Sequence, residues 1–111
     1  MHDLFSRREF NRVKFNRPIQ SSIESVTSIF KEKTEPTNEV TIYALDMSAG
    51  GIRFVSKVEF MINFLTTYRV KITISGRELV LYGKIIRKRD LINNIFEYGL
   101  QFNYSYHEQK V

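Results

Sequence analysis

The sequence predicts an all-β domain, and more narrowly a six-stranded antiparallel β-barrel. The first observation is compositional: nine Phe, six Tyr and many Val and Ile accompany little Ala, a mixture that favours strands over helices. The second is the alternation of apolar and polar residues in several short segments, which is typical of strands with one buried face. The third is that these segments number about six, and closing them into a barrel removes exposed sheet edges.

A single domain accounts for the chain, because 111 residues suffice for one domain of ordinary size and not for two. We expect a flexible N-terminal segment over residues 1–12, the barrel over residues 13–105 and a C-terminal tail over residues 106–111. The N-terminal segment is largely polar and cationic, so little holds it on the barrel by itself.

The first predicted strand is long and bent, because Pro18 interrupts it. Its apolar residues are Val13, Phe15, Ile19 and Ile23. A polar loop follows over Lys31 to Asn38 (KEKTEPTN). Two short strands are expected next, Val40 to Asp46 and Ile52 to Ser56.

The clearest strand is Tyr68 to Ser75, in which apolar and polar residues alternate without exception. A Ser75-Gly76 turn leads into the returning strand Leu79 to Arg87. A second turn is expected at Asn93-Asn94, because asparagine tolerates a positive φ angle. The last strand again alternates, with apolar residues Phe96, Tyr98, Leu100 and Phe102.

One segment has the spacing of a helix. In Val58 to Leu65 the apolar residues follow the i, i+3, i+4, i+7 pattern. The alternative is an irregular connection between two strands, and the sequence leaves both open.

Charge and composition narrow the function. The net charge of +5 favours an anionic partner such as a nucleotide, a nucleic acid or an acidic surface. The chain has no cysteine, which excludes disulfides, thiol nucleophiles and cysteine-bound metals. The N-terminus MHDLFSRREF lacks the apolar core of a signal peptide, and no apolar run approaches the roughly 20 residues that span a bilayer. We therefore expect a cytoplasmic protein without membrane insertion.

Catalytic residues are scarce. The only histidines, His2 and His107, lie near opposite ends of the sequence, where a solvated side chain is the default. No pairing of a nucleophile with a base and no metal-ligand spacing is present. We expect neither an enzyme nor a bound metal or cofactor.

The first motif of interest is RxxxR, formed by Arg8 and Arg12, with Arg7 directly before it. Arginine presents a planar fork that binds phosphate oxygens or the O6/N7 edge of guanine with two hydrogen bonds, and it stacks on base faces. The spacing alone is weak, because a solvated basic segment ahead of the first strand explains it as well.

The second motif is DxSxxG, formed by Asp46, Ser48 and Gly51. Asp46 can accept hydrogen bonds from a guanine or cap the turn itself. Ser48 can donate to a phosphate oxygen, and Gly50 and Gly51 let the backbone approach a ligand closely. Composition predicts about 0.01 such spacings by chance, so this motif is the more specific. The alternative is a glycine-rich turn with a structural role only.

Together, and in this order, the two motifs resemble those of the PilZ domain family, bacterial receptors for cyclic di-GMP. The resemblance continues through the strand pattern and covers roughly Arg7 to Tyr104. The matching downstream segments are Asp46 to Ser56 (DMSAGGIRFVS), Tyr68 to Ser75, Gly83 to Arg87 (GKIIR) and Tyr98 to Phe102 (YGLQF).

The resemblance implies a PilZ-like barrel that binds cyclic di-GMP on its outer surface. Arg8 and Arg12 match the family's arginines that wrap the ligand from the N-terminal segment. Arg7 matches the position before that motif, where an arginine accompanies binding of an intercalated ligand dimer. Family members often end in a helix, but only Ser105 to Val111 (SYHEQKV) remains for one, so we expect a short C-terminal helix at most.

The second motif matches the residues that complete the base and phosphate contacts from the barrel, and its members are Asp46, Ser48 and Gly51. The implied function is reception of cyclic di-GMP, relayed to a downstream protein as the ligand orders the N-terminal segment. The flagellar motor and the polysaccharide synthesis machinery are candidate partners.

Two other functions stay open. A small basic barrel can bind single-stranded nucleic acid through backbone charge and base stacking. The residues for such a groove would be Lys84, Arg87, Lys88 and Arg89. A PilZ-like barrel can also act as a protein adaptor without a ligand. The intact pair of motifs favours cyclic di-GMP over nucleic acid and over the adaptor.

Overall fold

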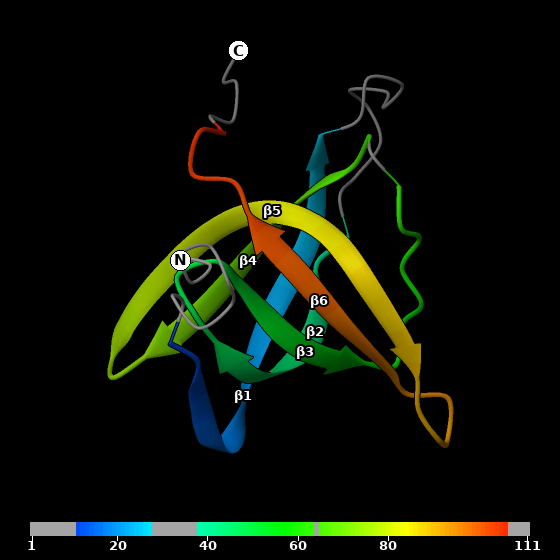
Figure 1. The fold of residues 1–111 in the computed structure, drawn as a ribbon, viewed down its shortest axis with the longest axis horizontal. Helices are drawn as coiled ribbons and strands as arrows, with labels where there is room; N and C mark the ends of the chain where they lie inside the picture. Colours follow the sequence, from blue (N-terminus) through cyan, green and yellow to red (C-terminus); the bar gives the residue numbers. More distant parts are fainter. Residues whose placement is uncertain (1–10, 28–37, 64, 107–111) are drawn as a thin grey trace, which may run out of the picture.

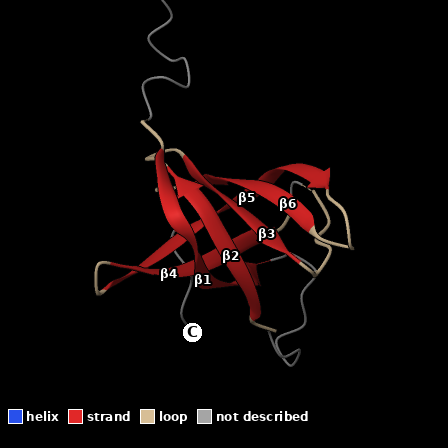
Figure 2. Ribbon diagram, turned by 90° about the horizontal axis from the view of Figure 1, so that it is seen from below, coloured by secondary structure: helices blue, strands red, loops and turns tan. Residues whose placement is uncertain are grey.

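The computed structural model describes residues 11–27, 38–63 and 65–106, and these contain six strands and no helix (Figures 1 and 2). The strands are β1 (Val13–Thr27), β2 (Val40–Met47), β3 (Gly51–Ser56), β4 (Thr67–Ile74), β5 (Arg77–Asp90) and β6 (Phe96–Phe102).

The strands close into a barrel in the order β1-β2-β3-β6-β5-β4, with β4 returning to pair with β1. Every neighbouring pair is antiparallel. Figure 1 shows β6 lying between β3 and β5. Closure satisfies the backbone groups that an open sheet would leave at its edges. The predicted six-stranded antiparallel barrel is confirmed.

The core fills the barrel with the apolar residues that alternate along the strands. Phe54 and Tyr98 are its largest buried side chains, and their rings stack with centroids 5.4 Å apart. The other buried apolar residues are Ile23, Ile42, Ala44, Ile52, Tyr68, Val70, Ile72, Ile85 and Leu100. The period-two pattern in the sequence therefore identified the inward face of β4 and of β6 correctly.

Both predicted turns are present. Ser75 and Gly76 have φ angles of 53° and 79°, and Asn93 and Asn94 have φ angles of 61° and 58°. Two consecutive positive φ angles suit the right-handed twist of the strands that such a turn joins. The strand after the first turn is longer than the sequence predicted: β5 starts at Arg77 and continues to Asp90.

The bend predicted near Pro18 lies within β1. Its pairing with β2 is interrupted between Lys14 and Ile19, although β1 runs unbroken from Val13 to Thr27. Proline has no N–H to donate to a neighbouring strand, so the ladder breaks where it occurs. The bend is the blue turn at the lower end of β1 in Figure 1.

The connection between β3 and β4 is irregular in the residues that the structure describes, so the helical alternative for Val58 to Leu65 is wrong. Phe60 anchors it, because the Phe60 N–H donates to the Tyr98 hydroxyl over 2.7 Å. The Phe60 ring also makes edge contacts with the rings of Phe54, Tyr68 and Tyr98. The Phe60 ring therefore packs this segment against the core without a helical apolar face.

Some predictions concern residues outside the described part of the chain. These are the flexibility of residues 1–10, most of the polar loop and any helix in residues 107–111. The three-part division at residues 12 and 105 likewise stays a prediction. Within the described residues, no helix has the length and apolar character that crossing a membrane requires.

Candidate functional site

A shift in strand register places Asp46 on the outer face of the barrel. Ala44 of β2 lies opposite Phe54 of β3, and both are in the core. The next pair is Asp46 opposite Arg53, so Leu45 is an extra residue on β2. Because opposite residues share a face and Arg53 precedes the core residue Phe54, both Asp46 and Arg53 project outward.

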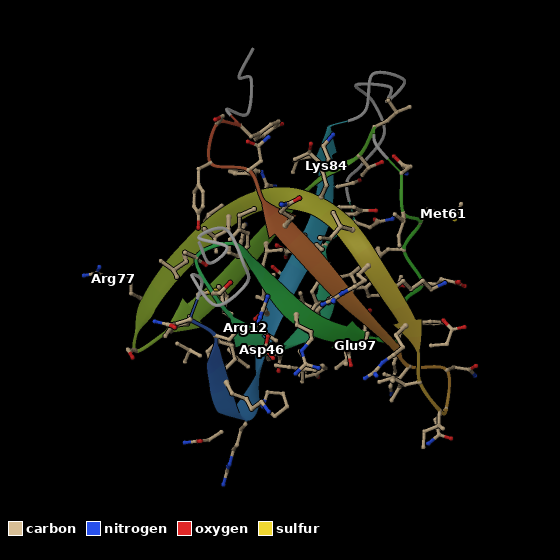
Figure 3. The ribbon with its side chains drawn as sticks, in the orientation of Figure 1. Arg12, Asp46, Met61, Arg77, Lys84 and Glu97 are labelled. Carbon is tan, nitrogen blue, oxygen red and sulfur yellow. The ribbon has the colours of Figure 1, made fainter. Side chains whose placement is uncertain are left out.

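The Asp46 carboxylate is clamped between two arginines. One oxygen, Oδ1, accepts a hydrogen bond from Arg12 Nη1 over 2.5 Å. The other, Oδ2, accepts from Arg53 Nε over 2.8 Å and from Arg53 Nη2 over 2.6 Å. The Asp46 side chain is only 4% exposed, whereas that of Arg12 is 47% exposed. The carboxylate therefore holds Arg12 in place while its guanidinium stays open to solvent (Figure 3).

The ion pairs continue across the barrel from β3 to β6 and β5. Arg53 Nη1 lies 3.2 Å from Glu97 Oε2, and Arg89 Nη2 lies 2.9 Å from Glu97 Oε1. The resulting chain of charges, which we call the Asp46 network, consists of Arg12, Asp46, Arg53, Glu97 and Arg89. Bidentate and charge-assisted contacts of this kind fix side chains more firmly than isolated surface pairs do.

The arginines of the network lower the pKa values of its two carboxylates. Burial alone would raise the pKa of Asp46, but hydrogen bonds and positive charge from Arg53, and then from Arg12, outweigh it and lower that pKa. Burial would also raise the pKa of Glu97, but hydrogen bonds and positive charge from Arg89 and Arg53 outweigh this effect. The pKa of Glu97 is therefore lowered too. Both carboxylates are ionised at neutral pH, and both serve to position guanidinium groups.

The DxSxxG motif forms the tight turn between β2 and β3. The Ser48 N–H donates to the Gly51 carbonyl over 2.9 Å, and the Gly50 N–H donates to Ser48 Oγ over 3.1 Å. The Gly50 carbonyl accepts from the Phe102 N–H of β6 over 3.0 Å. Ser48 is thus 9% exposed and held in a fixed orientation beside the start of β3.

Gly51 is a glycine for a reason that the sequence did not reveal. A Cβ atom at this position would lie 2.3 Å from the backbone oxygen of Leu100 on β6. That separation is far below any van der Waals contact, and a backbone oxygen in a barrel strand cannot move aside. The last glycine of the motif therefore permits the close approach of β3 to β6.

An open groove adjoins the turn and the exposed end of the Asp46 network. It is lined by residues of β3, β5 and β6 together with Arg12 and the turn. Its lining residues include Arg12, Ser48, Gly51, Arg53, Arg87 and Gln101.

The structure brings the described members of the predicted site together. Arg12, Ser48, Gly50 and Gly51 line the groove, and Asp46 anchors Arg12 at its edge. The remaining two predicted residues, Arg7 and Arg8, lie outside the described residues. Within those residues, no cluster of His, Cys, Asp or Glu has the arrangement of a metal site.

Sequence reasoning missed Arg53 and Glu97 and assigned Arg87 only to the alternative nucleic-acid groove. Arg53 could have been found, because the alternation along β3 points it outward from between Ile52 and Phe54. In the strip proposed for nucleic acid, Lys88 already has partners on the protein. Lys88 ion-pairs with Glu59, lies 3.8 Å from Asp90 and sits 5.0 Å above the Phe96 ring.

Comparison with known proteins identifies the fold and the family. The chain matches the PilZ domain family over residues 6–110. Curated protein sequences give no match. The inhibitor of motility MotI/DgrA of Bacillus subtilis has a similar structure, at 17% identity and a TM-score of 0.63, over 88% of this chain and 43% of that one. The present chain thus spans less than half the length of that protein.

Two isolated PilZ domains are also similar. The PilZ domain of CeSA from a cellulose-synthesizing bacterium is 18% identical with a TM-score of 0.54, over 86% of this chain and 83% of that one. The PilZ domain of YcgR from Escherichia coli, whose structure contains c-di-GMP, is 11% identical with a TM-score of 0.58, over 91% of this chain and 81% of that one. At these identities the structures establish the fold.

The family match settles the class of function. PilZ domains are non-catalytic receptor or adaptor domains that commonly bind c-di-GMP, which confirms the prediction that the chain is not an enzyme. The match over residues 6–110 includes both sequence motifs, the whole barrel and the groove beside the turn. The chain is accordingly a member of the PilZ domain family.

Proposed function

We propose that this chain binds cyclic di-GMP in the groove beside the DxSxxG turn. The observation that carries the proposal is the Arg12–Asp46 ion pair, which presents a half-exposed guanidinium at the edge of that groove. Cyclic di-GMP offers two phosphates and two guanines, and an arginine fork binds either group with paired hydrogen bonds. The presence of c-di-GMP in the related YcgR PilZ domain supports the same ligand here.

The turn supplies the contacts that arginine does not. Ser48 Oγ accepts from the Gly50 N–H, which leaves the hydroxyl proton of Ser48 to be donated to a phosphate oxygen. The backbone of Gly50 and Gly51 also lines the groove, without side chains to keep a ligand away.

Asp46 acts chiefly by positioning arginine. Both of its oxygens already accept hydrogen bonds, and its side chain is almost fully covered. A guanine N–H reaches this carboxylate only if Arg12 swings off it and onto the ligand. Such an exchange releases one carboxylate oxygen for the base at the moment when Arg12 gains a phosphate or a guanine edge.

The N-terminal segment completes the proposed site. Arg7 and Arg8 bind the same ligand as Arg12, because three cations close together in sequence gain one anionic partner in common. Ligand binding then shifts residues 1–12 toward a single arrangement, and a downstream protein reads that arrangement. Motility and polysaccharide synthesis are the processes that the similar structures suggest, and the cytoplasm is the compartment.

Calorimetric titration of the purified chain with cyclic di-GMP tests the binding. GTP and a short single-stranded RNA serve as competing ligands, and calorimetry suits a chain without tryptophan. We expect cyclic di-GMP to bind at least tenfold more tightly than either. Equal or tighter binding of the RNA would instead favour the nucleic-acid function, and no binding of any ligand would favour the adaptor.

Amide hydrogen exchange tests the relay. Exchange across residues 4–12 should slow sharply when cyclic di-GMP is added, because the ligand supplies the charge partners of the N-terminal arginines. Exchange in β4, which contributes no residue to the lining of the groove, should stay unchanged and serves as the internal reference. If residues 4–12 are fully protected before the ligand is added, ordering of this segment is not the signal.

A further inference from the structure

Tyr104 lies just after β6 and reaches back to the turn that carries the DxSxxG motif. Its hydroxyl donates a hydrogen bond to the Ala49 carbonyl over 2.7 Å. Ala49 stands at a position that the motif leaves open, so neither sequence motif accounts for this contact. Tyr104 is also 68% exposed, so burial in the core does not account for it either.

The residues next to Tyr104 fix its ring beside the turn. The Asn103 N–H donates to the Tyr82 carbonyl of β5 over 2.8 Å, which ties the chain to the barrel directly after β6. The Tyr104 ring makes an edge contact with the Phe102 ring, with 5.9 Å between the centroids. The segment that follows β6 is therefore anchored, and it holds the Tyr104 hydroxyl against Ala49.

This hydrogen bond acts on the peptide group that joins Ala49 to Gly50. A trans peptide group is planar, and its C=O and N–H point in opposite directions. Holding the Ala49 carbonyl therefore also orients the Gly50 N–H, which donates to Ser48 Oγ over 3.1 Å. A carbonyl that accepts a hydrogen bond polarises its peptide group, so the bond from Gly50 to Ser48 becomes stronger as well.

The turn needs this support because a glycine follows Ala49. Glycine adopts either sign of φ at little cost, so the Ala49–Gly50 peptide group could rotate if nothing held it. The next peptide group is held separately, because the Gly50 carbonyl accepts from the Phe102 N–H over 3.0 Å. Tyr104 thus holds one peptide group of the turn, and the end of β6 holds the following one.

We propose that Tyr104 is a positioning residue for the ligand-binding turn, acting on Ser48 through the Ala49–Gly50 peptide group. This inference rests on the proposed function, in which the Ser48 hydroxyl donates to a phosphate oxygen. Because Ser48 Oγ accepts from the Gly50 N–H, its own proton is directed at the ligand only while that peptide group keeps its orientation. Tyr104 is not among the residues that line the groove, so it acts without touching the ligand.

Calorimetric titration of Tyr104→Phe with cyclic di-GMP tests the hydroxyl. We expect the affinity to fall about two- to tenfold, the range of one neutral hydrogen bond. The melting temperature should stay close to that of the wild type, because the ring and its contact with Phe102 remain. The control is Tyr106→Phe, which removes a hydroxyl from the same segment, leaves the bond to Ala49 in place and should bind like the wild type.

A double-mutant cycle separates positioning of Ser48 from a general loosening of the site. Once Ser48→Ala has removed the serine hydroxyl, adding Tyr104→Phe should not weaken binding further, because the proposed route ends at that hydroxyl. In an Arg12→Ala background, Tyr104→Phe should weaken binding by the same factor as in the wild type. The reason is that Asp46, and not the turn, holds Arg12.

Amide hydrogen exchange in the ligand-free chain, measured by NMR, tests the same contact without relying on the proposed function. The Gly50 amide proton should exchange severalfold faster in Tyr104→Phe, because the peptide group that carries it is no longer held. The Leu91 amide proton donates to the Ile95 carbonyl in the β5–β6 turn, so it should exchange at the wild-type rate and serves as the internal reference.

The outcomes distinguish failure of this inference from failure of the proposed function. Wild-type affinity in Tyr104→Phe overturns the role of Tyr104, and so does a loss of affinity matched by an equal loss of folding stability. A further loss in the Ser48→Ala background overturns the route through Ser48. If the wild type binds no cyclic di-GMP, the proposed function fails, and Gly50 exchange alone decides whether Tyr104 positions the turn.

Discussion

Two nearly buried carboxylates on this barrel, Glu24 and Asp46, each accept a hydrogen bond from an arginine, but different structures lie around them. Glu24 of β1 is 7% exposed and accepts from Arg69 Nη2 over 2.5 Å, and the two residues lie directly opposite each other on β1 and β4. Asp46 of β2 is 3% exposed and accepts from Arg12, also over 2.5 Å, and from Arg53. The first pair joins two neighbouring strands, whereas the second belongs to a network that borders the groove beside the DxSxxG turn.

The comparison separates an ion pair between two strands from an ion pair at the edge of a groove. Neither Glu24 nor Arg69 lines the groove beside the DxSxxG turn. The Asp46 network borders the groove beside the DxSxxG turn, and both Arg12 and Arg53 line that groove. We therefore expect changes at Glu24 to alter folding and changes in the arginines near Asp46 to alter ligand binding.

The largest expected effect lies within the DxSxxG motif and concerns folding. Gly51→Ala should lower the free energy of unfolding by about 3 kcal/mol, because the added methyl group meets the Leu100 backbone oxygen at 2.3 Å. Urea denaturation measures the change. Gly76→Ala is not a matched control, because its φ angle of 79° adds backbone strain. If Gly51→Ala keeps wild-type stability and only loses ligand, the motif is wholly a binding device.

The next largest expected effect is a loss of ligand affinity when Arg12 or Arg8 is replaced. A charge-assisted hydrogen bond contributes about 1.5–3 kcal/mol, and about 1.4 kcal/mol is tenfold in affinity. Arg12→Ala, and likewise Arg8→Ala, should weaken cyclic di-GMP binding ten- to a hundredfold. The melting temperature should change little for Arg12→Ala, since Arg53 still holds Asp46 through two hydrogen bonds. Equal losses of binding and of folding would make Arg12 a structural residue.

The corresponding change in the other pair should have the opposite outcome. Glu24→Gln removes the negative charge that Arg69 Nη2 contacts in a largely buried site, which costs about 1–2 kcal/mol after allowance for the 20% exposure of Arg69. Chemical denaturation should detect this loss, while calorimetry should give unchanged affinity for cyclic di-GMP. Weaker ligand binding by the folded variant would erase the distinction between the two pairs.

The smallest effect is a dependence of stability on pH. The pKa of Asp46 is lowered in the folded chain from its usual 3.8, so its ion pairs stabilise the fold fully above that value. Their contribution is lost as the pH falls through the lower, folded-state pKa. Asp46→Asn should therefore show a shallower decline in melting temperature below about pH 4 than the wild type. Identical acid limbs in the two proteins would show that Asp46 does not contribute.

Much of the fold could be predicted from the sequence because the relevant signals are local. Alternation over Tyr68 to Ser75 marks a strand wherever its partner lies, and Ser75-Gly76 and Asn93-Asn94 adopt positive φ angles with little help from distant residues. The helical spacing at Val58 to Leu65 was misleading for the same reason. The spacing of neighbouring residues carries no information about the contact of Phe60 with Tyr98, which lies 38 positions away in the sequence.

The sequence by itself determined the strands, the turns and the two motifs, and through these the PilZ family. Only the tertiary structure decided which charges meet. Arg12 and Asp46 lie 34 positions apart, and Arg53 and Glu97 lie 44 apart. One extra residue at Leu45 and another at Ile86 reverse the alternation and turn Asp46 and Arg87 onto the outer face. Register is a property of paired strands, so the Asp46 network exists only once the barrel has closed.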